Sequence, residues 1–362
     1  MKFVTRFSPV ALHFGSLETR LLQLTGGPGG WNVNLSLKAQ GQGNTRHSKA
    51  ASSLAPGLKS RAMGKDVCVA TSTERAAMSV IPVERPQMDR LQATLEDAAV
   101  KSLEDSEGIS YRYLPLTDQQ SANQERNEFL LLSLGQSEMR RCTAASEALG
   151  FRPVGLEISA FPEARALIQA NKDINDAWAF LHLSLDHAYF GIALDGEVHF
   201  LKTMERNGSL LLKTMYDGVG AGQGGAPVGM APGFLVESDS DDQGSMFDQA
   251  QTQLQELTEM AEEQGTRLMS AVRVEAANLA QEVRACLRHF HARNQGHSVA
   301  ALELTGFAAG IPGLHTLLEQ SLKMPTEVAR PFTKLGIGAP VEVLREQHMW
   351  CSNLGLALRS AA

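Results

Sequence analysis

The feature that most constrains the fold of this 362-residue chain is a pattern of three strands joined by two tight turns, which occurs twice. In the first copy, the apolar strand Pro9–Phe14 turns through Gly15-Ser16 into Glu18–Leu24, where apolar and polar residues alternate. A glycine-rich breaker then leads into Trp31–Leu37, which places Trp31 and the alternate apolar residues on one face. The first copy is therefore a three-stranded meander.

The second copy begins at Ala177–Leu185 and continues through Tyr189–Leu194 and Glu197–Met204. The turn between its last two strands is Asp195-Gly196, a strong hairpin signal. Two related lobes create a cleft between them, and such clefts are common places for ligands. The duplication is therefore more informative than any single residue.

The segment between the two copies predicts a smaller α/β unit. Asp66–Thr71 and Met78–Val83 are expected strands, and Pro86–Leu103 is an amphipathic helix. A further set of two strands, a helix and a strand is expected to form a subdomain with its own sheet; these elements are Ile109–Leu116, Glu128–Leu134, Gln136–Leu149 and Arg152–Ile158.

Three stretches are interpreted as loops because they are rich in small or charged residues and poor in large apolar ones. They are Lys38–Lys65, Asp217–Gly233 and the acidic Glu237–Asp242. Phe247–Arg293 is in contrast a long helical region with one apolar stripe, which favours a packed helix over a coiled coil.

The stretch Val299–Leu314 predicts a strand, a small-residue turn at Gly306–Gly310 and then a helical pattern opening at Ile311. This arrangement lets backbone N–H groups and a helix N-terminus approach an anion or a nucleotide. Many α/β proteins use the same arrangement only to turn a strand tightly into a helix, so both interpretations stay open here. Helix Leu314–Leu322, a short strand at Thr326–Ala329 and a C-terminal helix around His348–Leu358 complete the chain.

Composition excludes several classes of function. A net charge of −7, with no basic run interleaved with aromatics, argues against nucleic acid and acidic membrane surfaces as partners. The four cysteines are far apart and form no CxxC pair, as expected for reduced thiols. No apolar run approaches the roughly 20 residues of a membrane span, and polar residues interrupt any signal peptide. We expect a soluble, intracellular protein.

With these elements in place, the chain resembles the PilM-type type IV pilus assembly proteins of the FtsA/actin-like ATPase superfamily. The most specific motif that supports this resemblance is Asn-Leu-Gly-Leu-Ala-Leu-Arg at Asn353–Arg359. The remaining matching pieces are Val10–Leu24, Gln136–Leu167 (with Leu149-Gly150-Phe151-Arg152-Pro153-Val154 and Ala160-Phe161-Pro162), Ala179–Gly208 and Leu304–Leu314.

The resemblance implies an α/β fold with actin-like (ribonuclease H-like) duplicated lobes around a central cleft, and a small α/β subdomain inserted in the first lobe. The expected units are a first lobe at 1–84 with a flexible insertion at 38–65, the small subdomain at 85–158, a connecting helix at 159–176, a second lobe at 177–340 with a flexible loop at 217–247, and a C-terminal helix at 341–362 that returns to the first lobe.

The resemblance also implies ATP and Mg²⁺ in the cleft, held by two phosphate hairpins and the turn at Gly306. Carried over by position, the cofactor-binding residues are Gly15, Ser16, Ser184, Gly208, Gly306, Phe307, Ala308 and Ala309. No catalytic or metal-ligating residue is assigned.

The chain departs from the family pattern at the positions that handle magnesium and phosphate. His13 replaces the acidic residue before the first hairpin glycine, and His182-Leu183-Ser184 replaces an Asp-x-Gly word. Phe307 and Ala308 stand where the adenosine turn has glycines, and an Ala-Glu-x-x-Lys word after Asn207-Gly208 is missing. Mg²⁺ prefers carboxylate oxygens, so we expect no ATP hydrolysis.

Other candidate residues favour structural roles. His289 and His291 lie two apart on a helix, so they do not share a face and are expected at the surface. The Asp239–Asp242 cluster lacks the spacing of a calcium loop. His13 and His182, one in each hairpin, are the pair that a shared cleft would bring face to face.

Our first hypothesis is a non-hydrolysing scaffold for a type IV pilus or a related secretion apparatus, located at the cytoplasmic face of the inner membrane. By resemblance, its partner is the cytoplasmic N-terminal tail of a bitopic PilN-like protein, in a groove formed roughly by Pro86–Ile158 against Val10–Leu37. The alternative is an active ATPase or small-molecule kinase of the same fold. A third possibility is the cytoplasmic part of a type II secretion platform, although such proteins continue into a membrane span that we do not expect here.

Overall fold

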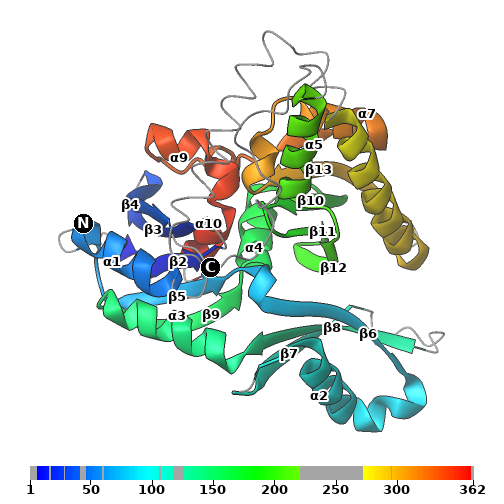
Figure 1. The fold of residues 1–362 in the computed structure, drawn as a ribbon, viewed down its shortest axis with the longest axis horizontal. Helices are drawn as coiled ribbons and strands as arrows, with labels where there is room; N and C mark the ends of the chain where they lie inside the picture. The colour runs from blue at the N-terminus through cyan, green and yellow to red at the C-terminus, as the bar shows by residue number, and fades with distance from the viewer. Residues whose placement is uncertain are drawn as a thin grey trace.

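The fold is described from a computed structural model, which places residues 6–15, 18–27, 29–40, 46–58, 61–105, 107–116, 126–220, 272–294 and 296–359. Figure 1 shows two lobes, each built on its own sheet, above a smaller sheet. Ser16, the acidic stretch Glu237–Asp242 and the part of the predicted long helix before residue 272 lie outside the described residues.

The sheet of the first lobe confirms the first meander. Its strands are β1 (Arg6–Phe7), β2 (Val10–Phe14), β3 (Glu18–Gly27), β4 (Gly30–Gln40), β5 (Asp66–Thr71) and β9 (Arg152–Ile158). Five of them follow the order β4-β3-β2-β5-β9, and β1 pairs with the far end of β3. The β2–β3 and β3–β4 pairs are antiparallel, whereas β2–β5 and β5–β9 are parallel.

The sheet of the second lobe repeats this plan. Its strands are β10 (Ala177–Leu183), β11 (Ala188–Leu194), β12 (Glu197–Met204), β13 (Val299–Thr305) and β14 (Thr326–Val328). They follow the order β12-β11-β10-β13-β14, again an antiparallel meander followed by two parallel strands. Asp195 and Gly196 both have positive φ in the β11–β12 turn, as the Asp-Gly signal predicts. The predicted duplication is confirmed.

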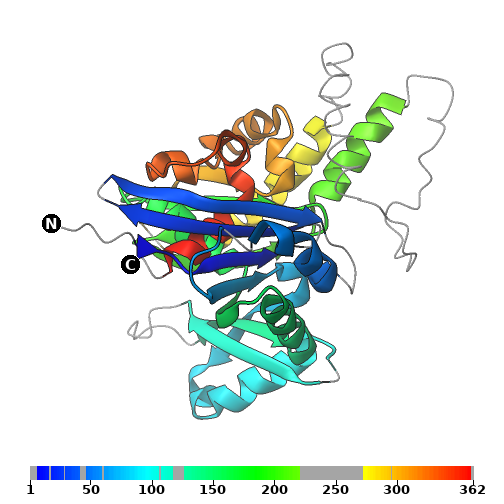
Figure 2. The ribbon, with the colours of Figure 1, turned by 90° about the vertical axis from the view of Figure 1, so that its left-hand side faces the viewer.

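A third, antiparallel sheet joins β6 (Ala76–Glu84), β8 (Arg126–Gly135) and β7 (Ile109–Pro115). One of its faces packs on α2 (Leu91–Ser102), which follows a 3-10 turn at Arg85–Arg90. The other face packs against Trp178, Phe180 and Leu201 of the second lobe. The small sheet is thus held between α2 and the second lobe (Figure 1), and Figure 2 shows the same small sheet below the first lobe.

Two predictions about these regions are wrong. We expected Arg152–Ile158 in the small sheet, but β9 pairs with β5, and β6 supplies the third strand of the small sheet instead. We expected a flexible insertion over 38–65, but β4 extends to Gln40 and Arg46–Leu58 forms α1. The helix forms because Leu54 and Leu58 bury their side chains against the first sheet.

The two faces of the first sheet are covered by different parts of the chain. One face packs on α1 and on α3 (Gln136–Ala148), through residues that include Cys142 and Ala145. The opposite face, with Leu22 and Leu24, packs on the C-terminal region. That region comprises α8 (Pro331–Lys334), α9 (Val341–Arg345), the 3-10 turn Gln347–Met349 and α10 (Cys351–Leu358).

The C-terminal region reaches the first sheet earlier than we expected. Phe332 and Ile337, which we placed in the second lobe, pack with the first sheet, and Gly338 bridges to Asn32 of β4. The limits of the units remain predictions, but the crossing between lobes begins before residue 340.

One helix, α4 (Ala160–Ala170), lies between the two sheets and beside α10 (Figure 1). The two helices approach so closely at Gly355 that a Cβ there would lie 1.6 Å from the carbonyl oxygen of Pro162. Asn353 of α10 also donates hydrogen bonds to the carbonyl oxygens of Ala11 (3.0 Å) and Arg20 (2.9 Å). The residues of the Asn353–Arg359 motif therefore make the contacts of α10 with α4 and with the first sheet.

The second sheet packs on α5 (Gly208–Gly220), on a helix at residues 272–293 and on α7 (Leu314–Leu322). Within the described part of the predicted apolar stripe, Val272, Ala276, Leu279 and Val283 are fully buried. The helix after the small-residue turn begins at Leu314 and not at Ile311. Among the described residues, no helix is both long and apolar enough to cross a membrane.

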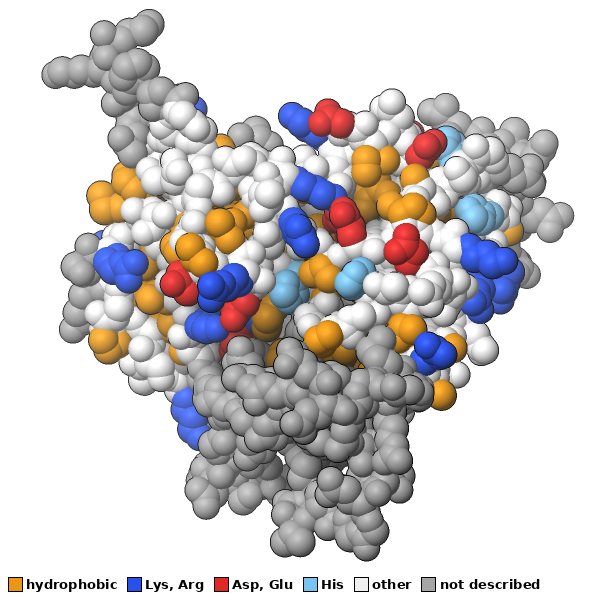
Figure 3. Space-filling view, turned by 90° about the horizontal axis from the view of Figure 1, so that it is seen from above, with side chains coloured by type: hydrophobic (Ala, Val, Ile, Leu, Met, Phe, Trp, Pro, Cys, Tyr) orange, Lys and Arg blue, Asp and Glu red, His pale blue; other side chains and the backbone are white. Residues whose placement is uncertain are grey.

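The surface in Figure 3 carries acidic and basic side chains interspersed over the described part of that face. The four cysteines are buried and form no disulfide.

Candidate functional site

The turn after β13 depends on a glycine with an unusual backbone conformation. Gly306 has φ of 78°, and a Cβ at this position would lie 2.7 Å from the carbonyl oxygen of Leu183 on β10. A larger residue would therefore be strained and would also push the strands apart. The N–H of Gly306 donates a hydrogen bond to the carbonyl oxygen of His348 at 3.1 Å.

The structure brings most of the predicted binding residues of the second lobe together around this turn. Gly208 donates its N–H to Ser184 O at 2.7 Å, and a Cβ on Gly208 would lie 3.2 Å from the Cβ of Ala308. Phe307, Ala308 and Ala309 form the 3-10 turn η5 (Phe307–Gly310), and all three are buried in the core of the second lobe. The ring of Phe307 thus packs into that core.

The first hairpin contributes Gly15, which follows β2. Its N–H donates to the carbonyl oxygen of Glu18 at 3.1 Å, and a Cβ would come within 2.8 Å of the same oxygen. The ring of His13 lies nearby, with Cε1 3.7 Å from that Cβ position. Ser16, the remaining predicted residue of this hairpin, lies outside the described residues.

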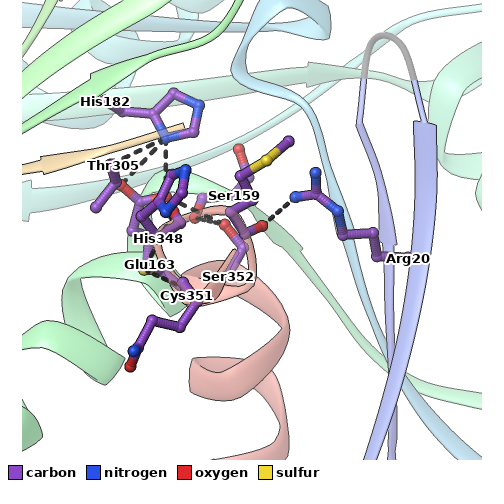
Figure 4. A network of polar contacts seen from close by, with 10 residues as sticks. Arg20, Ser159, Glu163, His182, Thr305, His348, Cys351 and Ser352 are labelled. Carbon is purple, nitrogen blue, oxygen red and sulfur yellow. Dashed lines mark hydrogen bonds and ion pairs between the residues drawn. The ribbon is translucent and has the colours of Figure 1, made fainter. Parts of the chain in front are cut away.

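The strongest polar site is centred on Glu163, which sequence reasoning missed. This carboxylate lies in the first turn of α4 and is 1% exposed. It contacts Nδ1 of His182 at 2.9 Å and accepts a hydrogen bond from Oγ1 of Thr305. On its other side, Oγ of Ser352 donates to Oε2 at 3.4 Å (Figure 4).

These contacts join four elements that are remote in sequence. Glu163 comes from α4, His182 from β10, Thr305 from β13 and Ser352 from α10. A buried carboxylate is costly unless it is paired and hydrogen-bonded, and here protein groups supply that compensation. We call Glu163, His182, Thr305 and Ser352 the Glu163 cluster.

Aromatic rings border the Glu163 cluster. The ring of His182 stacks on Tyr189, with centroids 4.6 Å apart, and on His187 at 5.3 Å. Burial raises the pKa of Tyr189 well above its usual value, and the Glu163 carboxylate acts in the same direction. Burial lowers the pKa of His187, although its partner Asp186, at 2.8 Å, opposes this effect. The His187 ring and the Tyr189 hydroxyl beside the cluster are therefore neutral at pH 7.

A second polar contact lies between the lobes at the turn Gln347–Met349. Arg20 of β3 forms an ion pair with Glu18, donates to the carbonyl oxygen of Met349 and lies 5.6 Å from the centre of the Trp350 ring. Burial lowers the pKa of His348 to about 4, and the positive charge of Arg20 adds to this effect. His348 is therefore neutral at pH 7.

These residues do not fit a magnesium–nucleotide. The backbone N–H groups of Gly15, Gly208 and Gly306, which would face phosphate, donate to protein carbonyl oxygens. The glycines are required by neighbouring protein atoms, and the buried carboxylate is engaged by protein side chains. Among the residues that the structure describes, no group of three His, Cys, Asp or Glu side chains is arranged to hold a metal ion.

Comparison with known proteins identifies the fold. A family model described as "Type IV pilus assembly protein PilM" matches residues 255–361. No curated protein matches the chain by sequence.

Among solved structures, a PilM–PilN type IV pilus biogenesis complex superposes with a TM-score of 0.70 at 15% identity, over 98% of this chain and 99% of that chain. The ethanolamine utilization protein EutJ from Carboxydothermus hydrogenoformans gives a TM-score of 0.52 at 13% identity, over 98% and 89% of the two chains. At these identities, the likeness establishes the fold and leaves function to be argued from the site.

Proposed function

We propose that this chain, which has the PilM-type actin-like ATPase fold, is a scaffold for type IV pilus assembly that binds the cytoplasmic tail of a PilN-like inner-membrane protein. The observation that carries the proposal is the superposition on a PilM–PilN complex over nearly the whole of both chains. The protein would then lie at the cytoplasmic face of the inner membrane, held there by its partner.

The free edge of β9 is a suitable place for an extended tail. Among the described residues, β9 pairs with β5 on one side only, so its other edge carries backbone groups that an added strand satisfies. Val154 on this strand is 48% exposed, which is unusual for a valine in a sheet. In the sheet order, β4 and β9 are the terminal strands, but Gly338 already pairs with Asn32 and Val33 on β4, so we place the tail along β9 rather than against Val10–Leu37.

A peptide titration tests this surface. The probe is a synthetic peptide with the N-terminal cytoplasmic tail of a PilN-like protein from the same genome, and binding is measured by fluorescence anisotropy. We expect Val154→Asp to weaken binding about tenfold or more, which corresponds to ~1.4 kcal/mol. The matched control is Val274→Asp, which places the same charge at an exposed valine on the helix at residues 272–293. Equal affinities for the two variants would contradict the proposed surface.

The scaffold role includes no ATP hydrolysis. An ATPase or kinase of this fold needs carboxylates that orient Mg²⁺ and water, whereas the second hairpin carries His182 and the nearby Glu163 is engaged by protein groups. Incubation with Mg²⁺ and ATP is expected to release no phosphate above the protein-free rate. Turnover that is lost on chelating the metal would favour the enzyme instead.

A further inference from the structure

The two lobes meet at contacts made by protein atoms from both sides. At the Glu163 cluster, His182 and Thr305 belong to the second sheet, whereas Ser352 lies on α10, which packs against the first sheet. Ser352 also donates to the carbonyl oxygen of Ser159, one residue before α4 begins, at 3.2 Å. A single buried carboxylate therefore links the second sheet to the helix that covers the first (Figure 4).

The turn Gln347–Met349 makes a second link. On the side of the first lobe, Arg20 donates to the carbonyl oxygen of Met349. On the side of the second lobe, the carbonyl oxygen of His348 accepts the N–H of Gly306 at 3.1 Å. Adjacent residues of one short turn thus contact β3 of one lobe and the end of β13 of the other.

In two-lobed proteins that close around a ligand, the ligand supplies contacts to both lobes and so stabilises the closed form. Here the Glu163 carboxylate and the N–H of Gly306 are already engaged by groups of the chain itself. We propose that the Glu163 cluster and the Gln347–Met349 turn replace a bound nucleotide as the link between the lobes, so that their closed arrangement is independent of ligand.

Electrostatics favour a permanent link. The charge of Arg20 is paired with Glu18, and both side chains are largely buried. His348 is neutral at pH 7, so it does not repel Arg20. The Glu163 carboxylate has protein partners on both oxygens. Neither link leaves a charge that requires a metal ion or a phosphate for compensation.

The distance between the lobes tests the proposal. Spin labels on Val154→Cys in the first sheet and Val274→Cys in the second lobe report it, because both positions are exposed and the native cysteines are buried. We expect the same distance distribution with and without millimolar Mg²⁺ and ATP, and no rise in Tm. A nucleotide that joined the lobes would shorten or sharpen the distribution and raise Tm by several degrees. Either of these changes would overturn the proposal.

Variants test whether the named contacts make the link. Glu163→Gln keeps the shape of the side chain but removes its charge, and Arg20→Ala removes the donor to Met349; we expect both to broaden the distance distribution. The control is Lys38→Ala, because Lys38 contacts Glu346 beside the same turn through an exposed ion pair at 3.2 Å. Unchanged distributions for both variants would also overturn the proposal.

Two milder variants keep the test informative if either main variant fails to fold. Arg20→Lys keeps the cation but shortens its reach, and Ser352→Ala removes one donor to Glu163. Broadening without loss of helical circular dichroism is the expected result. The contacts between the lobes are separate from the edge of β9. The peptide titration therefore tests the binding of the tail, and the distance measurement tests the link between the lobes, so either proposal can be contradicted without the other.

Discussion

The two large sheets share one order over five strands, yet different remote parts of the chain complete their cover. One face of the second sheet packs on α5, on the helix at residues 272–293 and on α7, all of which follow its meander in sequence. In the first lobe, the connections in the same positions are α1 and α3, which cover one face of the first sheet, whereas the opposite face packs on the C-terminal region, which follows the second sheet in the chain. The other face of the second sheet packs partly on the small sheet, which precedes it in the chain. Each lobe therefore depends on a remote part of the sequence.

The sheets also differ at their last strands. In the first sheet, β9 has seven residues and an exposed valine, whereas β14 in the second sheet has three residues and leads into α8. Short edge strands give little template for pairing with another chain. The comparison favours the first lobe as the lobe that binds a partner.

The largest expected effect tests the remote cover of the first sheet. Gly355→Ala places a Cβ 1.6 Å from the carbonyl oxygen of Pro162, so α10 must move away from α4. We expect a loss of more than about 4 kcal/mol in the free energy of unfolding, measured by urea denaturation. Gly27→Ala is the control, because its Cβ would meet nothing within 4 Å. Similar losses for both variants would show that α10 does not depend on this close approach.

A second substitution tests the other cover of the first sheet. Leu54 of α1 is 2% exposed and packs with the apolar side chains of β2, β3 and β4. We expect Leu54→Ala to cost about 3 kcal/mol in urea denaturation, as for other buried leucines. A change near zero in the free energy of unfolding would favour the flexible insertion that the sequence predicted for 38–65.

A third experiment compares ion pairs near the open edge of each sheet. Lys334 pairs with Glu303 and Glu327, and burial raises the pKa of Glu303 while Lys334 opposes this effect. Lys334→Met leaves Glu303 buried without its cation, so we expect a loss of about 2 kcal/mol in unfolding free energy. The matched variant Arg152→Met breaks the exposed pair with Asp66 and is expected to cost less than about 1 kcal/mol. Equal costs would remove this contrast between the edges.

The smallest expected effect is a pH dependence at the lobe junction. The folded-state pKa of His348 is about 4, so between that value and its ordinary pKa near 6.5 the unfolded chain binds more protons. This contribution to stability is complete above about pH 6.5 and is lost as pH falls toward 4. Urea denaturation at pH 7 and at pH 4.5 is expected to show about 2 kcal/mol more acid loss for the wild type than for His348→Asn. Parallel losses would contradict the burial of His348.

The sequence predicted both meanders because turn residues and alternation are local signals. The order of strands around Asp195-Gly196 needed no knowledge of distant residues. The helix α1 was missed because its buried side chains are sparse, with Ala51, Leu54 and Leu58 set among serine, alanine and glycine. The place of β9 was missed because parallel pairing with β5 joins residues more than 80 positions apart, and no local pattern records it.

The candidate site also contains residues that sequence reasoning found and one that it missed. The small-residue turn at Gly306 was noted from the strand-turn-helix pattern, and Gly208 and Ser184 from the family resemblance; the structure brings these residues together. Glu163 was missed because a carboxylate in the first turn of a helix is ordinary at the N-terminus. Its role depends on His182, Thr305 and Ser352, which reach it from 19, 142 and 189 positions away.

The cover of the first sheet by α10 has a consequence during synthesis of the protein. The strands that contain Ala11, Leu22 and Leu24 are synthesised long before Leu354 and Leu356, which pack against their apolar face. During translation that face has no native partner, and an exposed apolar sheet is prone to aggregate. The first lobe is therefore expected to complete its folding only after α10 has been synthesised.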